Sequence, residues 1–280
     1  MTRCSTALVP DSERLARARA QYERCLLCEH RCAVNRASGE HGACKAGTEV
    51  RLFRHRIEYG EEPEIVPSHL FYVSGCDLRC AFCIAGANAF DPRRGRVLDQ
   101  AEFDAAVAWG RERGVRTLQW VGGEPTIHLP AILELMTCSP HLPPVVWKSD
   151  FFGTPEAFSL LTGSVDVFVA DFKFGNDDCA KRLAGIGDYM SIVGRNLQLA
   201  AERADLIVRH LLLPGHWECC FRPIVNWMKR NLPGAKFSIR DGYLPMWQAA
   251  RHAELRRPLP PGIGSAARQL AIAAGLNLIY

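Results

Sequence analysis

The sequence of 280 residues contains no uninterrupted apolar run of eighteen residues, the length that a membrane-spanning helix requires. It also has no low-complexity tract, no internal repeat and no long basic run, and its net charge is only +4. These absences exclude a fibrous or disordered chain and argue against a dedicated nucleic-acid surface. The opening residues, Met1-Thr2-Arg3-Cys4, do not resemble the apolar region of a secretory signal. We therefore expect a cytoplasmic protein without a membrane partner.

Cysteine, in contrast, is abundant, with twelve residues in the chain. A reducing compartment keeps ordinary thiols unpaired, so clustered cysteines indicate metal or redox chemistry before they indicate structural disulfides. Seven of the twelve fall into two groups along the chain, Cys25, Cys28, Cys32 and Cys44 in the first and Cys76, Cys80 and Cys83 in the second. This grouping predicts two metal sites.

Composition and hydrophobic periodicity divide the chain into two regions. Residues 12–24 predict a polar helix, and residues 25–60 are rich in Gly, Cys, Arg and His without a sustained period, as expected of a segment that folds around a metal. We predict an N-terminal helix with a Cys-rich metal-binding segment over residues 1–62, followed by a larger domain over residues 63–280.

After Pro67, short apolar strands alternate with helical stretches, which is typical of βα units around a parallel sheet. Asp99 and Glu102 form a capping box at the start of one of the helices. The predicted strands are 70–74, 117–121, 145–148, 165–170, 206–213 and 236–239, and the remaining helices are 129–138, 155–162, 176–200, 220–231 and 265–274. Six units fall short of a full barrel of eight, so this α/β sheet is either open and doubly wound or an incomplete barrel.

In both architectures the chemistry lies at the carboxyl ends of the strands. The sequence places its notable polar residues there, one group after each strand: Cys76; Gly122, Gly123 and Glu124; Ser149 and Asp150; Asp171 and Lys173; His216; and Asp241. We expect these side chains to line one mouth.

The second cysteine group has the spacing C-x3-C-x2-C on one loop. A structural zinc ion takes four protein ligands, and no fourth Cys or His follows nearby. An iron–sulfur cube can instead be held through three of its irons. If Cys76, Cys80 and Cys83 hold such a cube, its fourth iron has no cysteine ligand and remains open as a substrate site.

This trio resembles the hallmark of radical S-adenosylmethionine (SAM) enzymes, with Phe82 in the aromatic position before the last cysteine. Gly122-Gly123-Glu124-Pro125 resembles the GGEP segment of the same superfamily. The resemblance implies an incomplete (β/α)6 barrel, a [4Fe-4S] cluster and SAM as cofactors, and a role for this segment in receiving the methionine amino group. Glycine, which has no Cβ, would let the ligand approach the sheet edge.

Two further segments are similar to those of pyruvate formate-lyase activating enzymes. Asp171-Phe172-Lys173 resembles their D-x-K segment, and the run from Arg209 to His216 resembles their R-x4-P-G strand. The resemblance is greatest to activating-enzyme-like proteins that add an N-terminal C-x2-C-x3-C…C segment. It implies that Asp171, Lys173 and Arg209 face SAM or the substrate. Ser149 and Asp150 follow the third strand, where such proteins often carry Ser/Thr-Asn, and we expect them to bind the cofactor. His216 is a further catalytic candidate.

The four N-terminal cysteines leave two alternatives open, because four thiolates satisfy a closed tetrahedral zinc ion or a fully ligated iron–sulfur cluster. Arg31, Arg36, His30 and His41 would offset the negative charge of a cluster. A cluster would relay electrons, whereas zinc would only fix a cap over the mouth.

The expected function is therefore reductive cleavage of SAM to a 5′-deoxyadenosyl radical, which abstracts hydrogen from a glycyl-radical partner protein, a peptide or a small metabolite. A flavodoxin or ferredoxin would supply the electron. One alternative is a non-catalytic iron–sulfur protein for electron transfer or metal sensing, and another is a zinc-binding nucleic-acid module. Asp171 and Lys173 could also be a plain surface pair, and Cys219-Cys220 could offer thiols near the mouth or begin a helix.

Overall fold

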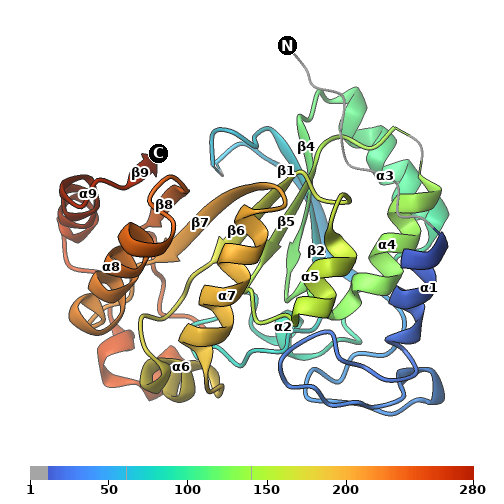
Figure 1. Cartoon of the computed structure of the whole chain (residues 1–280), viewed down its shortest axis with the longest axis horizontal. Helices are drawn as coiled ribbons and strands as arrows, with labels where there is room; N and C mark the ends of the chain where they lie inside the picture. Colours follow the sequence, from blue (N-terminus) through green and yellow to red (C-terminus); the bar gives the residue numbers. More distant parts are fainter. Residues whose placement is uncertain (1–11, 61, 140) are drawn as a thin grey trace.

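The structure is a computed structural model that describes residues 12–60, 62–139 and 141–280. The opening residues Met1 to Cys4 lie outside the described part of the chain. One nine-stranded sheet with the order β3-β1-β2-β4-β5-β6-β7-β8-β9 runs through the molecule. Helices follow it along one side (Figure 1), as the predicted βα units require.

The six predicted strands are all present, each within two residues of its predicted ends. They are β2 (Ser68–Val73), β4 (Thr117–Gly122), β5 (Val145–Ser149), β6 (Val167–Asp171), β7 (Asp205–Leu211) and β8 (Lys236–Arg240), and β9 (Asn277–Ile279) extends the sheet. All seven pair in parallel and in chain order. Because the order never reverses, the sheet is not doubly wound. Among the described residues, the edge strands β3 (Arg96–Val97) and β9 do not pair with each other, so the sheet is not closed.

Strand β1 (Arg51–Glu58) corrects the expectation that residues 25–60 are irregular throughout. It pairs antiparallel with β2, from Leu52 opposite Val73 to Glu58 opposite Ser68. Its sequence mixes three arginines, a histidine and a glutamate with three apolar residues. Polar side chains are tolerated in β1 because it lies near the sheet edge and one of its faces meets the cavity described below. For this reason its sequence does not show the apolar pattern of the other strands.

The helices are α1 (Ser12–Ala20), α2 (Ala87–Phe90), α3 (Gln100–Glu112), α4 (Leu129–Cys138), α5 (Pro155–Leu161), α6 (Asp177–Ala184), α7 (Tyr189–Ala201), α8 (Arg222–Asn231) and α9 (Ile263–Ala273). The Asp99 side chain accepts from the Glu102 N–H at 2.8 Å and caps α3 as predicted. The predicted helix over 176–200 is divided in two, because Gly185 ends α6 with a left-handed φ of 76°. Helix α1 ends at Ala20, four residues earlier than predicted.

Buried aromatic side chains fill the space between sheet and helices. Phe103 of α3 stacks on Trp120 of β4 with ring centroids 5.5 Å apart, and Phe71 of β2 contacts both rings. All three are fully buried. No helix in the described ranges has both the length and the apolar character needed to cross a bilayer.

The Cys-rich segment lies against the loops at the carboxyl ends of the strands. His30 Nε2 lies 2.8 Å from the Asp77 carbonyl oxygen, and Arg79 donates to the Ala43 carbonyl at 2.7 Å. The buried Arg36 guanidinium donates to the Ile127 carbonyl at 2.8 Å. These contacts fix the segment, dark blue in Figure 1, beside the Cys76–Cys83 loop.

Candidate active site

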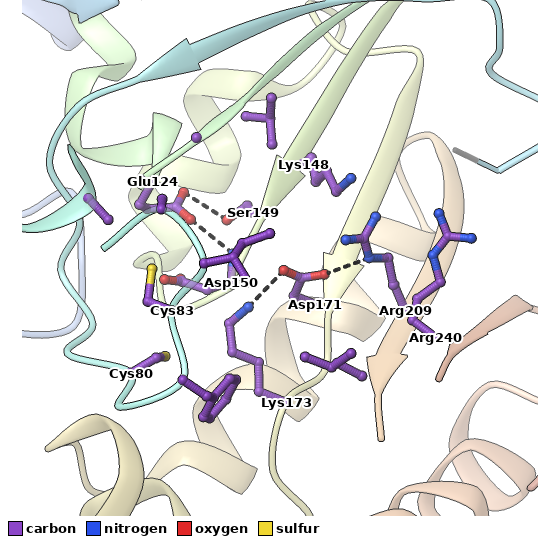
Figure 2. A pocket seen from close by; sticks show the side chains of 18 of the residues that line it. Cys80, Cys83, Glu124, Lys148, Ser149, Asp150, Asp171, Lys173, Arg209 and Arg240 are labelled. Carbon is purple, nitrogen blue, oxygen red and sulfur yellow. Dashed lines mark hydrogen bonds and ion pairs between the residues drawn. The ribbon is translucent and has the colours of Figure 1, made fainter. Parts of the chain in front are cut away.

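A cavity of about 900 Å³ opens at the carboxyl ends of the parallel strands. Figure 2 shows this cavity with Glu124, Asp150, Asp171 and Lys173 among the labelled side chains. Twelve predicted site residues line the cavity: Cys76, Cys80, Phe82, Cys83, Gly122, Gly123, Glu124, Ser149, Asp150, Asp171, Lys173 and Arg209. They come from the carboxyl-terminal parts of β4, β5, β6 and β7 and from the loop after β2. The expected single mouth is therefore present, with His216 and the four N-terminal cysteines outside its lining.

The three cysteines of the loop after β2 face this cavity. Cys83 donates its N–H to the Cys80 carbonyl at 3.2 Å, which closes the turn between them. Burial raises the pKa of Cys80 to about 12 and raises the pKa of Cys76 well above its ordinary value. Buried thiols that resist ionisation become thiolates when a cation binds them, so this donor set fits an iron–sulfur cluster held by three cysteines.

The two glycines after β4 are required by the neighbouring backbone. A Cβ on Gly123 would lie 1.6 Å from the Gly75 carbonyl oxygen, and a Cβ on Gly122, whose φ is +127°, would lie 2.4 Å from the Val73 nitrogen. The neighbouring backbone thus requires glycine at both positions, a reason separate from the expected approach of a ligand, and both glycines also line the cavity. They allow the end of β4 to pack against the segment that leads into Cys76.

Glu124 is fully buried and its carboxylate is held from three sides. Oε1 accepts from the Thr126 N–H at 2.9 Å and from the Ser149 hydroxyl at 2.8 Å, and Oε2 accepts from the Asp150 N–H at 2.9 Å. Burial and the nearby Asp150 raise the pKa of Glu124 to about 8. The Glu124 carboxyl group is therefore fixed in position at the cavity, but only neutral groups donate hydrogen bonds to it and none of them offsets its negative charge.

Asp77 and Asp150 lie beside the first cysteine of the trio. Cys76 Sγ is 3.9 Å from Asp77 Oδ1 and 3.9 Å from Asp150 Oδ2. Burial, together with Glu124, raises the pKa of Asp77 to about 7, and its Oδ2 is buried without a hydrogen-bond partner. Three buried carboxyl groups next to buried thiols are unfavourable without a cation, so these residues fit a metal cluster and an ammonium group.

Asp171 forms the centre of a charged row on the opposite wall. Lys173 Nζ lies 2.7 Å from Asp171 Oδ2, and Arg209 Nε lies 3.3 Å from Asp171 Oδ1. Asp171 and Arg209 are register partners at the ends of β6 and β7. Burial raises the pKa of Asp171, but Lys173 and Arg209 more than offset this effect and hold its pKa below the usual range. With 27% and 19% of their side chains exposed, Asp171 and Lys173 face the cavity and are not a plain surface pair.

Other residues at the site support these groups. Phe82 packs edge-on against Phe174 with centroids 6.0 Å apart. Tyr189 accepts the Lys173 backbone N–H at 2.7 Å. The outer wall of the cavity is rich in arginine and was not predicted. Arg54 and Arg56 of strand β1 contribute to it together with Arg240 and Arg268.

The N-terminal cysteines lie near one another but not in a tight group. The thiols of Cys25, Cys28 and Cys44 influence one another electrostatically, and burial raises the pKa of Cys28 well above its ordinary value. Among the residues described, no three ligand atoms of this set lie within 4.8 Å of one another. Arg36 Nη1 is 3.8 Å from Cys25 Sγ. The spacing is wider than the ligand shell of a single tetrahedral ion.

His216 does not lie at the mouth. Its ring meets Cys179, Cys219 and Cys220 outside the cavity. The sequence did not predict this group of four, because helix α7 and strand β7 lie between Cys179 and His216 along the chain.

Comparison with known proteins bears on this arrangement. The profile of the Radical SAM superfamily matches residues 70–228. An uncharacterized protein of Methanocaldococcus jannaschii is 34% identical over 265 residues, which cover 92% of this chain and 77% of that protein.

Solved structures share the fold at low sequence identity. The radical SAM methyltransferase from Sphaerobacter thermophilus is 14% identical, with a TM-score of 0.53 over 94% of this chain and 87% of that one. SuiB of Streptococcus suis bound to its precursor peptide SuiA is 14% identical, with a TM-score of 0.53 over 72% of this chain. The match spans only 46% of the length of SuiB.

Proposed function

This chain belongs to the radical SAM superfamily, and on that premise we propose that its cavity binds SAM beside a [4Fe-4S] cluster held by Cys76, Cys80 and Cys83. The observation that carries the proposal is the convergence of these three thiols, Glu124 and the Asp171–Lys173 pair on one cavity. When bound, the cluster supplies the single electron that cleaves SAM to a 5′-deoxyadenosyl radical. The protein's own residues bind, orient and shield the reactants.

We assign the amino group of SAM to the acidic side of the cavity. Glu124 is held there by Thr126, Ser149 and Asp150, and it gains a counter-charge when an ammonium group approaches. The segment of Gly122 and Gly123 supports Glu124 from behind, through its close packing on Gly75. Phe82 shields the cysteine loop from water.

Asp171, Lys173 and Arg209 are the proposed polar contacts for the rest of SAM and for the substrate. Because Asp171 accepts from both cations, the ammonium and guanidinium groups are held in fixed positions and keep further donors for an incoming carboxylate or hydroxyl group. The row can therefore position a substrate next to SAM without changing its own protonation.

The cationic outer wall favours a substrate with anionic groups. Arg54, Arg56, Arg240 and Arg268 line the cavity beyond Arg209. Arg56, Arg240 and Arg268 pair with Glu58, Glu62 and Asp241, but of these acids only Asp241 lines the cavity. The excess of arginine at this wall attracts carboxylates or phosphates. We propose hydrogen abstraction from such a substrate, either a glycyl-radical partner protein, as for pyruvate formate-lyase activating enzymes, or a peptide or small metabolite.

For Cys25, Cys28, Cys32 and Cys44 we propose a second iron–sulfur cluster rather than zinc. Their separation exceeds that of ligands around one ion, whereas thiolates on separate irons of a cube stand farther apart. Cys28 is close enough to Asp77 for the two to interact, so the second cluster would lie near the first and could relay electrons from a flavodoxin or ferredoxin.

The test is formation of 5′-deoxyadenosine by anaerobically reconstituted, reduced protein. We expect the wild type and a Cys138→Ser control, whose thiol is exposed and outside both cysteine groups, to form it at equal rates. We expect Cys80→Ser to form none. Wild-type protein with a full cluster that yields no 5′-deoxyadenosine would instead favour the electron-transfer or sensor alternative.

A further inference from the structure

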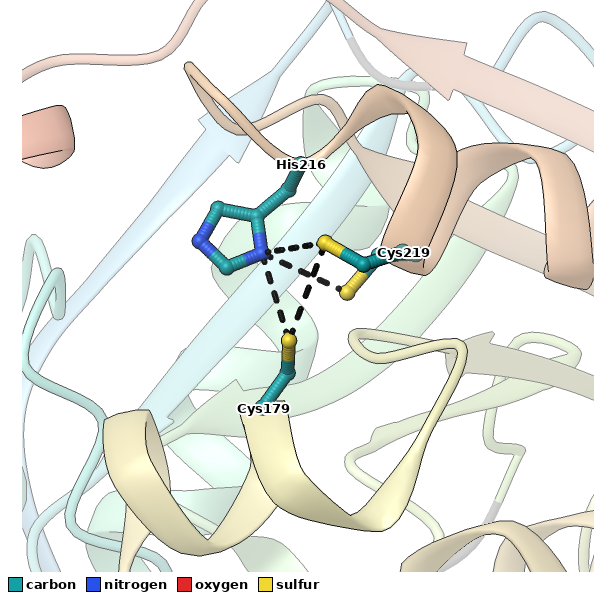
Figure 3. Close-up of side chains that lie close together, drawn as sticks. Cys179, His216 and Cys219 are labelled. Atoms are coloured by element: carbon teal, nitrogen blue, oxygen red, sulfur yellow. Dashed lines mark hydrogen bonds between the residues drawn. The ribbon is translucent and has the colours of Figure 1, made fainter.

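Four potential metal ligands meet outside the cavity, in a group that the proposed function does not use. Cys179 lies in the first turn of α6, His216 follows β7, and Cys219 and Cys220 lie in the helical turn Trp217–Phe221. Figure 3 shows the three sulfur atoms around the His216 ring. His216 Nδ1 lies 3.5 Å from Cys179 Sγ, 3.3 Å from Cys219 Sγ and 3.5 Å from Cys220 Sγ.

These distances match the edges of one tetrahedral coordination shell. Zinc–sulfur and zinc–nitrogen bonds of about 2.3 and 2.0 to 2.1 Å give a tetrahedron with sulfur–nitrogen edges of about 3.6 Å and sulfur–sulfur edges of about 3.8 Å. The observed sulfur–nitrogen distances are 3.3 to 3.5 Å, and Cys179 Sγ is 3.8 Å from Cys219 Sγ. The four donors therefore surround a space the size of a single ion.

Hydrogen bonding alone does not explain the group. A neutral imidazole nitrogen offers either one proton or one lone pair, yet three thiols approach the same Nδ1. A disulfide does not explain it either, because the 3.8 Å between Cys179 Sγ and Cys219 Sγ is far longer than an S–S bond of about 2.05 Å. One cation at the centre satisfies all four donors at once.

The local backbone is shaped to bring the two adjacent cysteines to the same point. Both Cys220 and Phe221 donate their N–H groups to the His216 carbonyl, at 3.0 and 3.1 Å, which makes a wide π-type turn. Gly175 permits this turn to pack closely, since a Cβ there would lie 2.3 Å from the Cys220 carbonyl oxygen.

Neighbouring side chains complete a second layer around the four donors. Asn176 Nδ2 donates to Cys179 Sγ at 3.3 Å and to the Cys219 carbonyl at 2.5 Å. On the far side of the ring, His216 Nε2 lies 3.6 Å from Glu254 Oε1 and 3.3 Å from Arg182 Nη2. With Nδ1 on a metal, Nε2 carries the proton, and the negative charge of Glu254, 3.6 Å away, favours the proton on that nitrogen. Three thiolates and a divalent ion leave one negative charge, which Arg182 offsets.

We propose that Cys179, His216, Cys219 and Cys220 bind one zinc ion in a closed, structural Cys3His site. The three thiols lose their protons on binding and the imidazole coordinates as the neutral base, so no oxidant or reductant is needed. The four side chains fill all four positions of a tetrahedral ion, so none is left for a substrate. None of the four residues lines the cavity. The ion would join α6 to the start of α8.

The direct test is zinc K-edge X-ray absorption on a Cys25→Ser/Cys28→Ser variant, in which the N-terminal group can no longer hold metal. We expect about one zinc per chain, with three sulfur ligands at about 2.3 Å and one nitrogen at about 2.0 to 2.1 Å. Adding Cys219→Ser should remove most of the zinc, whereas adding Cys138→Ser should not change it. If Cys219→Ser fails to fold, His216→Cys serves instead, and it should retain zinc with four sulfur ligands.

Three results would overturn the proposal: a Cys25→Ser/Cys28→Ser protein without zinc when purified from zinc-supplied cells, a zinc shell without nitrogen in that protein, or a disulfide between Cys179 and Cys219 in the anaerobically purified chain. Each readout is independent of SAM cleavage, so a failure here leaves the proposed function standing.

Discussion

Arg79 donates its backbone N–H to the carbonyl of Ala184 at 3.0 Å, and this bond ties the loop of Cys76, Cys80 and Cys83 to the last residue of α6. Ala81 adds a second bond, to the Leu183 carbonyl at 2.8 Å. The first turn of the same helix carries Cys179. One short helix thus connects the proposed zinc site to the cysteine loop at the cavity.

Loss of the zinc site should therefore weaken the cysteine loop from a distance. We expect Cys179→Ser to lower Tm by about 4 to 8 °C, which corresponds to about 2 kcal/mol for a chain of this size, and to speed the loss of iron from the reconstituted protein. Scanning calorimetry and the decay of cluster absorbance under a chelator measure the two effects. Cys138→Ser is the control, and an unchanged rate of iron loss in a Cys179→Ser protein shown to lack zinc would contradict the connection through α6.

Gly123→Ala should damage the fold at the cavity, because its Cβ would meet the Gly75 carbonyl oxygen at 1.6 Å. Backbone must move to relieve this overlap, and we expect the free energy of unfolding to fall by about 3 kcal/mol or more. Gly187→Ala is a matched control, since a Cβ at Gly187 meets nothing within 4 Å. Urea unfolding of both variants checks the prediction, which fails if the two are equally stable.

Asp171→Asn should remove the charge that holds Lys173 and Arg209. Because 27% of the Asp171 side chain is exposed, we expect a loss of about 1 to 3 kcal/mol at pH 7, less than for a fully buried pair. Formation of 5′-deoxyadenosine should fall at least about tenfold as the two cations lose their positions. Asp241→Asn, which breaks a more exposed pair with Arg268 at the same cavity, should change stability by less than about 0.5 kcal/mol.

The effect of Asp171→Asn should also depend on pH. The folded state lowers the pKa of Asp171, so its contribution to stability is present above the ordinary carboxyl pKa and is lost as the pH falls toward the folded value. The difference in unfolding free energy between wild type and Asp171→Asn should thus be larger at pH 7 than at pH 3. An equal difference at both values would show that the ion pairs do not stabilise the fold.

For Glu124 we predict that the contribution to stability depends on pH in the opposite direction. The folded state raises its pKa to about 8, so between the ordinary value and pH 8 the folded protein binds a proton that the unfolded chain has lost. Stability from this group is present at about pH 4 and declines as the pH rises to about 8. We expect Glu124→Gln to gain stability relative to metal-free wild type between pH 5 and pH 8, as measured by urea unfolding. A constant difference would mean that Glu124 is ionised in the fold.

Much of the fold could be predicted from local sequence. Helix α4 has its predicted ends, 129 and 138, because an apolar face and its flanking residues define it locally. The division of residues 176–200 into α6 and α7 depends on Gly185, a signal that was present but outweighed by the helical pattern around it. Strand β1 was not predicted because five of its eight side chains are charged or polar, and its identity as a strand comes from pairing with β2.

The cavity was easier to predict than the cysteine and histidine group outside it. Residues at strand ends converge wherever parallel strands share an edge, so Cys76, Glu124 and Asp171 could be placed together from order alone. Cys179 and Cys219 are 40 residues apart, and their meeting depends on how α6 packs beside the turn after β7. No spacing rule in a single sequence contains that information.

The most direct test of the proposed cofactor site is electron paramagnetic resonance of the reduced, reconstituted protein, with and without SAM labelled with nitrogen-15 in its amino group and carbon-13 in its carboxylate. If the iron left without a cysteine binds this molecule, the cluster signal should shift on addition and show hyperfine coupling to both labels. A signal from a fully formed cluster that is unchanged by SAM, with no coupling to either label, would contradict the account.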